Sequence, residues 1–241
     1  MAKVTRINQA VILAGGRGTR LRPLTDDKPK PMVLVNNRPF LEYLMDQLRW
    51  NGIREIVLLL GYLPEKVMDH FGDGSKFGVQ VRYSVSSAED GTGTRLRKAA
   101  RLMDEHFLLM NCDTYWPLRI EKLLEFHNEK NPLVSTAVYS NKDNITKNNT
   151  WVDDEGYITK FDPSRTSADL NVINLAHAIT SRDVVGLMPE KDFDYEKEIY
   201  PILVAKRQLA GYRSDQRHYS IGSLERLPIT EKFLRDRYGT A

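Results

Sequence analysis

The alternation of short apolar runs with helix-like segments constrains the fold most. The runs at 10–13, 55–60 and 107–110 are almost wholly apolar, as is typical of strands covered on both faces of a parallel sheet. Segments with helical spacing of apolar residues lie between and after these runs, at 39–50, 64–71, 94–104 and 120–130. This order, with a further strand at 79–83, predicts an α/β fold with a doubly wound, Rossmann-like, mostly parallel sheet.

The second half of the chain has a different pattern. Extended segments dominate it and are followed by two amphipathic helices. We expect strands at 133–139, 151–152, 157–161 and 170–179, and helices at 195–206 and 224–237. No linker rich in Pro, Gly or Ser separates the halves. We therefore expect a single domain over 1–241, in which 131–241 adds strands and a lid to 1–130.

Composition excludes several classes of function. Lys plus Arg total 35 and Asp plus Glu total 32, so the net charge of +3 gives no reason to expect nucleic acid as a partner. The single cysteine, Cys112, excludes an internal disulfide framework and fits a reducing cytoplasm. No apolar run approaches the ~20 residues of a membrane-spanning helix, and the first residues do not resemble a signal peptide. We expect a cytoplasmic protein with no membrane partner.

A glycine-rich loop follows the first predicted strand. Three glycines lie within the four residues 15–18, and such loops let main-chain N–H groups surround an anion. Arg17, Arg20, Arg22 and Lys30 add positive charge nearby. The spacing matches neither a P-loop nor the dinucleotide-binding fingerprint. The carboxyl end of a strand is nevertheless where open α/β sheets bind ligands, which favours a phosphate site over a plain glycine turn with solvated arginines.

A longer motif extends from this loop. LAGGRGTRLRPLT at 13–25, followed by PKPM at 29–32, resembles the signature of the sugar-1-phosphate nucleotidyltransferases, also called NDP-sugar pyrophosphorylases. The similarity continues through NNRPFLEY, GTG at 91–93 and NCD at 111–113. The segments RPFLEYLMDQL and HFGDGSKFGVQVRYSV are most similar to the subgroup that makes GDP-heptose from heptose 1-phosphate. The resemblance implies a nucleotidyltransferase domain with a nucleotide-binding half at about 1–130 and a sugar-binding half at about 131–241.

The resemblance also implies a reaction. A sugar 1-phosphate attacks the α-phosphorus of an NTP and releases pyrophosphate, with Mg²⁺ as cofactor. Because the nucleophile is already an anion, catalysis requires positioning and charge stabilisation, not a general base. By resemblance, Arg20 holds the leaving pyrophosphate, Lys30 bridges the α-phosphate and the attacking phosphate, and Asp113 binds Mg²⁺. The alternative for Asp113 is a carboxylate that only caps the following helix.

Binding residues are implied in the same way. The nucleotide is expected to contact Leu13, Ala14, Gly15, Gly16, Gly18, Thr19, Ser86, Gly91 and Thr92. Ser86 occupies the position where the heptose subgroup often has Glu, so the sequence does not determine which base the nucleotide carries. The sugar is expected to contact Asn111, Asp162 and Asn174. The alternatives are that the GTG segment is an ordinary glycine turn and that Asp162 and Asn174 are turn or strand-surface residues.

Two departures from the family pattern bear on function. Pro163 replaces the lysine of the family's E-K-P motif, and Ser220 replaces the aspartate that is usually a second magnesium ligand. They motivate two alternatives: a nucleotide- or sugar-nucleotide-binding regulatory protein, and a nucleotidyltransferase for a non-sugar phosphate or phosphonate. We expect Cys112 and His177 to be packing residues. A homo-oligomer is compatible with the resemblance, but the sequence does not set an oligomeric state.

Overall fold

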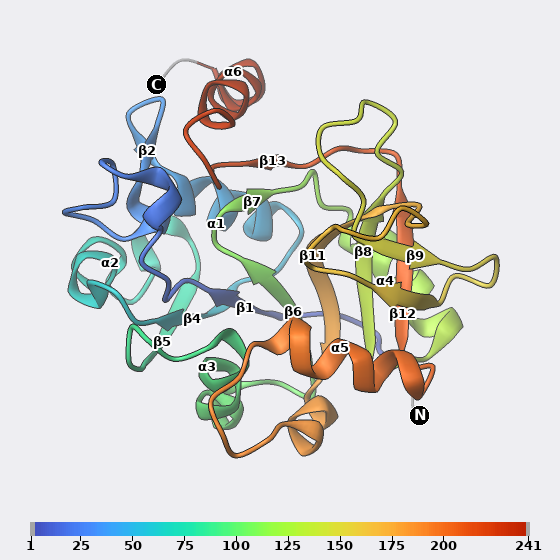
Figure 1. The fold of residues 1–241 in the computed structure, drawn as a ribbon. Coiled ribbons are helices and arrows are strands. Elements are labelled where there is room, and N and C mark those ends of the chain that lie inside the picture. Colours follow the sequence, from blue (N-terminus) through green and yellow to red (C-terminus); the bar gives the residue numbers. More distant parts are fainter. Residues whose placement is uncertain (1–2, 240–241) are drawn as a thin grey trace.

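The computed structural model describes residues 3–239, in which one seven-stranded sheet spans both halves of the chain (Figure 1). Across the sheet, the strands are β12 (Leu209–Ser214), β8 (Val134–Tyr139), β11 (Ile173–Ser181), β6 (His106–Asn111), β1 (Gln9–Leu13), β4 (Glu55–Leu60) and β5 (Gln80–Val85). Four of its six neighbouring pairs are parallel, and β11 runs antiparallel to both β6 and β8. The predicted α/β, mostly parallel architecture is confirmed. The two residues at each end of the predicted 1–241 domain lie outside the described residues.

Helices cover both faces of this sheet. One apolar cluster takes in α1 (Phe40–Trp50), α2 (Pro64–Phe71) and α4 (Ile120–Lys130), and a second takes in α3 (Thr92–Lys98) and α5 (Tyr195–Ala205). Successive residues of β4 alternate between the two clusters: Ile56 belongs to the first and Val57 to the second. Because both faces of the strand are buried, its sequence shows no polar alternation. The doubly wound arrangement is confirmed.

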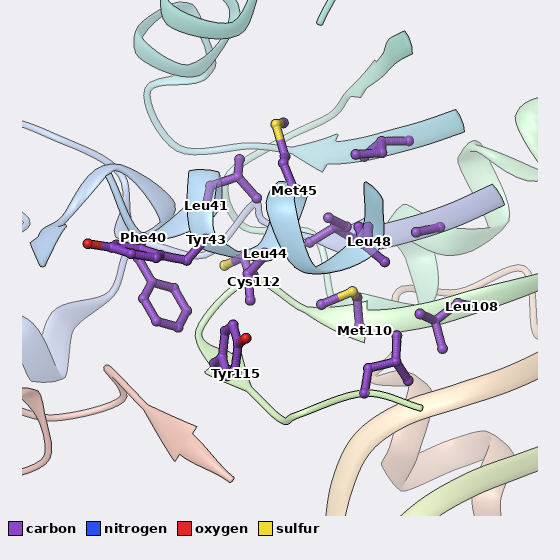
Figure 2. Close-up of a cluster of buried hydrophobic side chains, with 14 of the residues drawn as sticks. Phe40, Leu41, Tyr43, Leu44, Met45, Leu48, Leu108, Met110, Cys112 and Tyr115 are labelled. Atoms are coloured by element: carbon purple, nitrogen blue, oxygen red, sulfur yellow. The ribbon is translucent and has the colours of Figure 1, made fainter. Parts of the chain in front are cut away.

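Helix α1 packs on the strand that leads to the predicted metal ligand. Figure 2 shows Leu41, Leu44 and Leu48 of α1 in one cluster with Met110 of β6 and Cys112. These side chains are 6% exposed or less, and each fully buried Leu contributes about 1.5–3 kcal/mol. Packing of this kind fixes the carboxyl end of β6, which Asp113 follows.

Smaller elements complete the carboxyl-end face and the second half. The short strands are β2 (Leu34–Val35), β3 (Arg38–Pro39), β7 (Thr114–Tyr115), β9 (Thr150–Val152), β10 (Ile158–Phe161) and β13 (Tyr219–Ser220). The 3-10 helices are η1 (Thr19–Leu21), η2 (Lys30–Met32), η3 (Ser75–Phe77), η4 (Ala100–Leu102) and η5 (Arg182–Leu187). The last α-helix, α6 (Leu227–Tyr238), packs beside β13 and β2. None of the helices within residues 3–239 has both the length and the apolar character needed to cross a membrane.

Most predicted elements begin or end a few residues from the expected positions, and two of them also differ in structure. The helix expected at 94–104 ends at Lys98 and continues as η4. The buried amide of Gln9 donates to the Leu102 carbonyl at 3.0 Å and accepts from the Asp104 N–H at 2.9 Å, which holds this segment in a turn. The strand expected at 170–179 begins at Ile173, and its pairing with β8 is interrupted between Asn174 and Ala178.

Candidate functional site

The glycine-rich loop is held against the end of the neighbouring strand. The N–H of Ala14 donates to the Leu59 carbonyl and the N–H of Tyr62 donates to the Gly15 carbonyl, both at 3.0 Å. An added Cβ on Gly15 would lie 2.2 Å from Nη1 of Arg95, so a side chain here would have to displace that guanidinium. Gly18 adopts a φ of 66°, a conformation that favours glycine, and η1 with Thr19 begins directly after it. The sequence therefore fixes a loop that crosses the carboxyl ends of β1 and β4.

Two of the three residues predicted to be catalytic, Lys30 and Asp113, are in contact beside this loop, and the charge of the third, Arg20, acts on Asp113. Lys30, at the start of η2, donates from its ammonium to Oδ2 of Asp113, while the Thr114 hydroxyl donates to Oδ1 at 3.0 Å. The Lys30 and Asp113 side chains are 14% and 21% exposed, so solvent screens the pair only weakly. Burial opposes ionisation of Asp113, but Lys30, Thr114 and the charge of Arg20 outweigh it and hold its pKa below the usual value. Asp113 is an ionised carboxylate that is paired with Lys30 and stabilised by the charge of Arg20.

Two neighbouring cavities open at this edge of the sheet. The first, of about 270 Å³, is lined by Lys30 and Asp113 together with Leu13, Gly15, Gly16, Ala88, Asp90, Thr92, Arg95, Asn111 and Cys112. The second, of about 210 Å³, shares Leu13, Thr92 and Asn111 with the first and extends to Glu196 and Tyr200 of α5. Four of the nine predicted nucleotide residues line the first cavity, namely Leu13, Gly15, Gly16 and Thr92. Asn111 lines both cavities.

A larger hollow, of about 910 Å³, lies elsewhere, between residues 3–5 and α4. It is lined by Glu121, Glu125 and Glu129 with Lys3 as its cation. A surface with this excess of carboxylates repels a triphosphate. The two cavities beside Asp113 are thus the better candidates for a phosphate chemistry.

Arg95 supports the glycine-rich loop from below, a role that the sequence did not reveal. The residue is 4% exposed. Its guanidinium donates to the Leu60 carbonyl at 3.0 Å, to the Ser86 hydroxyl at 3.1 Å and to the Ala88 carbonyl at 3.0 Å. It thereby ties α3 to the 86–88 segment and leaves no room for a side chain at Gly15. The sequence feature that could have indicated this role is a positively charged residue on the apolar side of a predicted helix.

The GTG segment is braced by residues about 100 positions later. The N–H of Gly91 donates to Asp192 at 2.8 Å, and the Thr92 hydroxyl accepts from the N–H of Tyr195 at 2.9 Å. A Cβ on Gly91 would meet the Phe193 carbonyl at 2.1 Å. Packing against this segment accounts for the glycine, while Thr92 also lines both cavities.

Glu196 is a second residue that sequence reasoning missed. It lies in the first turn of α5 and accepts a hydrogen bond from Nδ2 of Asn174 at 2.9 Å. The Thr136 hydroxyl fixes the other end of that amide by donating to it at 2.7 Å. Burial, and then the charge of Asp194, raise the pKa of Glu196 to about 7. The predicted sugar residue Asn174 therefore belongs to a polar group at the second cavity.

Asp162 lies in a turn and lines neither of these cavities. Its carboxylate accepts from the main-chain N–H groups of Ser164, Thr166 and Ser167, each at 2.9 Å. Hydrogen bonds from Ser164 and from that main chain hold its pKa well below the usual value. The turn alternative describes these contacts, so the sugar role of Asp162 stays a prediction without support from its surroundings.

Ser220 lies next to Asp113 through a short strand pair. It pairs with Thr114 across β13 and β7, and the N–H of Ile221 donates to the Asp113 carbonyl at 3.0 Å. Within residues 3–239, no group of three or more His, Cys, Asp or Glu side chains forms a ready-made metal site. A single ionised carboxylate still fits Mg²⁺, which is usually held by one or two carboxylates together with phosphate oxygens and water.

Neither Cys112 nor His177 is placed to act as a nucleophile or base. Burial raises the pKa of the Cys112 thiol to about 12. Burial also lowers the pKa of His177 to about 4, and its ring lies in β11 with its centroid 5.7 Å from that of Trp116. Both are packing residues, as predicted.

Comparison with known proteins settles the family. The nucleotidyl transferase family model matches residues 9–161, which is more than half of the chain. The chain belongs to the nucleotidyl transferase family. The resemblance identified from the sequence motifs is thereby confirmed.

Relatives with assigned names give the context. Mannose-1-phosphate guanylyltransferase of Mycobacterium tuberculosis is 30% identical over 198 residues, or 81% of this chain and 55% of that protein. D-glycero-alpha-D-manno-heptose 1-phosphate guanylyltransferase of Campylobacter jejuni is 35% identical over 115 residues, or 48% of this chain and 52% of that protein. The chain thus spans about half the length of the curated relatives it matches. The crystal structure of HddC from Yersinia pseudotuberculosis complexed with GMP-PN shares the fold, with a TM-score of 0.80 and 24% identity over 94% of this chain and 100% of that one.

Proposed function

We propose that this protein transfers a nucleotidyl group from an NTP to a sugar 1-phosphate and releases pyrophosphate. The observation that carries the proposal is the ionised Asp113, paired with Lys30 and within the field of Arg20, at the edge of two joined cavities. The names of the relatives describe transfers of this kind by those proteins. Because both substrates are polyanions, the reaction requires positive charge beside the phosphates. The two cations supply it directly, and the ordered carboxylate would supply it by holding Mg²⁺.

The expected mechanism is an in-line displacement. A phosphate oxygen of the sugar 1-phosphate attacks the α-phosphorus, the new P–O bond forms, and the bond from the α-phosphorus to the β-phosphate oxygen breaks. Lys30 neutralises charge between the α-phosphate and the attacking phosphate, and Arg20 that of the departing pyrophosphate. No proton must be removed from the nucleophile, which agrees with the lack of a poised base at His177 or Cys112.

Asp113 would hold Mg²⁺ in this proposal. When bound, the ion would neutralise phosphate oxygens and help to orient the triphosphate. Lys30 keeps the carboxylate ionised and oriented before substrate arrives. Ser220 would add an uncharged oxygen on the same side.

The two cavities suggest separate binding sites for the nucleotide and for the sugar within a single domain. The larger one, bordered by Gly15 and Thr92, would take the nucleotide, and the one reaching Asn174 and Glu196 would take the sugar. The nucleotide half is then about 1–130 and the sugar half about 131–241, in a cytoplasmic enzyme. GTP and heptose or mannose 1-phosphates are the first substrates to test, since two relatives carry such names.

The direct test is pyrophosphate release from purified protein with Mg²⁺, each of ATP, CTP, GTP, UTP and dTTP, and a panel of sugar 1-phosphates. We expect release that requires both substrates, and we expect Asp113→Ala to abolish it while the circular dichroism spectrum stays unchanged. Reactions without sugar phosphate control for hydrolysis of the NTP. Tight NTP binding with no pyrophosphate from any acceptor would reject the enzyme and favour the regulatory alternative, which Ser220 and Pro163 motivate. Release only with phosphocholine or a phosphonate would favour a non-sugar acceptor.

A further inference from the structure

A third cavity lies on the other side of Ser220, outside the two cavities described above. It measures about 210 Å³, and its polar lining consists of Arg217, His218, Tyr219, Ser220, Arg226 and Thr230. We propose that this cavity, with Arg226 as its main contact, binds the phosphate group of the acceptor substrate. The inference rests on the proposed function and identifies the anion site on the acceptor side of it.

The polar lining of this cavity has more positive charge and more donors than its neighbours satisfy. Arg226 forms no ion pair within residues 3–239, and its one side-chain hydrogen bond runs to the Ser220 hydroxyl at 3.4 Å. Arg217 pairs with Asp143 at 2.9 Å, but its Nε is buried without a hydrogen-bond partner. His218 is 9% exposed, and its Nδ1 is also buried without a partner. Buried polar atoms of this kind usually have a partner, so the polar side chains around the cavity are not fully satisfied within the described residues.

The cavity is close to the catalytic carboxylate. A Cβ placed on Gly222 would lie 3.6 Å from the Ser220 hydroxyl oxygen and 3.8 Å from Oδ2 of Asp113, so both side chains face the same small space. The guanidinium of Arg226 donates to the same hydroxyl at 3.4 Å. An anion bound at Arg226 and Ser220 would therefore lie next to the space that Asp113 borders.

The uncharged residue at 220 is what leaves Arg226 available. A carboxylate at this position would lie within reach of the guanidinium and would neutralise it. A second arginine adds to the positive field: burial, and then the charge of Arg226, lower the pKa of Arg165. Arg165 forms no ion pair within residues 3–239, but the charge of Glu196 acts on it as well. Arg226 is therefore the cation of this group that an anion would stabilise most.

The size and chemistry of the cavity suit a phosphate group. Its volume of about 210 Å³ is large enough for one. The planar guanidinium binds phosphate through two parallel N–H···O bonds. Of the groups in the reaction, the phosphate of the sugar 1-phosphate is the one expected on this side of Asp113.

The kinetic test compares Arg226→Gln with Arg235→Gln. Arg235 lies on α6, the helix for which Arg226 is the N-cap residue. It is exposed and has no ion pair within the described part of the chain, so its variant loses the same charge away from the cavity. We expect Arg226→Gln to raise KM for the sugar 1-phosphate at least about tenfold, the scale of one charge-assisted hydrogen bond. KM for the NTP should stay within about twofold, and Arg226→Lys should recover part of the loss. An equal or larger rise in KM for the NTP would assign Arg226 to the triphosphate and overturn the proposal.

A binding test does not depend on turnover. The melting temperature is measured with inorganic phosphate while a non-hydrolysable NTP analogue saturates the glycine-rich loop. Phosphate should raise the melting temperature of the wild type and of Arg235→Gln, but not that of Arg226→Gln, because only binding to the native state stabilises. If no sugar phosphate is a substrate, the proposed function fails and this experiment still decides the anion site. Equal stabilisation of Arg226→Gln would refute it. If that variant does not fold, Arg226→Lys replaces it, with a weaker response expected.

Discussion

Glu196→Gln tests the electrostatics of the second cavity beside Asp113, which extends to Glu196. Burial and the charge of Asp194 raise the pKa of this carboxyl from 4.5 to about 7, so the folded protein holds a proton that the unfolded chain releases. Glutamine keeps an oxygen that can accept from Asn174, which lies 2.9 Å from Oε1 in the wild type. The substitution therefore removes the ionisation and leaves the hydrogen bond.

The sign and size of the effect follow from linkage. Below pH 4.5 the group is protonated in both states, so it imposes no charge penalty. Between pH 4.5 and about 7 only the unfolded chain is ionised, and wild-type stability falls as pH rises; above about pH 7 the penalty is constant. The full shift is equivalent to about 3 kcal/mol, and we expect about 2 kcal/mol because the side chain is partly exposed.

Urea unfolding at several pH values between 4 and 8.5 measures this difference. The Glu196→Gln protein should match the wild type near pH 4 and exceed its free energy of unfolding by about 2 kcal/mol at pH 8. Glu198→Gln, on an exposed position of the same helix, should follow the wild-type curve. If the wild-type and Glu196→Gln curves run parallel across the whole range, the carboxyl is not buried in the way the structure indicates.

Further substitutions test the catalytic cations and the backbone. Arg20→Ala and Lys30→Ala should each reduce kcat at least ~10²-fold, the scale of one preorganised charge stabiliser; unchanged pyrophosphate release in either would contradict its role. Ala176 has a φ of 52°, a conformation that costs an L residue roughly 1–2 kcal/mol. Glycine removes this cost but lowers stability by about 0.4–1 kcal/mol, because it increases the conformational entropy of the unfolded chain. Ala176→Gly should therefore raise the free energy of unfolding by about 0.5 kcal/mol and Ala176→Val should lower it by at least ~1 kcal/mol; urea titrations that show the reverse order would contradict the strained conformation.

The first half of the fold was predictable because its strands are buried on both faces. A run such as 55–60 has no polar alternation, since Ile56 and Val57 enter different apolar clusters, and this identifies a parallel strand without any knowledge of its neighbours. The proximity of Lys30 to Asp113 was predictable only through the family resemblance. The position of Asp113 followed from the strands, because it comes after β6, whose carboxyl end lies beside that of β1.

The supporting residues were not predictable, because their roles depend on distant segments. Arg95 acts on a loop 80 positions earlier in the chain through the carbonyl of Leu60 and the close approach to Gly15. Glu196 acquires its raised pKa from burial beneath segments that the sequence does not place next to it. The antiparallel insertion of β11 between β6 and β8 is equally invisible to periodicity, since an extended run has the same pattern in either direction.

The two departures from the family pattern take a different meaning in three dimensions. Compared with the family pattern in sequence alone, Pro163 replaces a cation and Ser220 replaces an anion, and each replacement suggests a weakened site. Taken together, the two replacements leave the sum of charges unchanged. The missing carboxylate is the group that would neutralise Arg226, whose guanidinium lies 3.4 Å from the Ser220 hydroxyl. A guanidinium free of a carboxylate partner beside Asp113 can take over from a lysine that is absent. The departures thus indicate a relocated phosphate contact more than a lost activity, and KM for the sugar phosphate in Arg226→Gln separates the two.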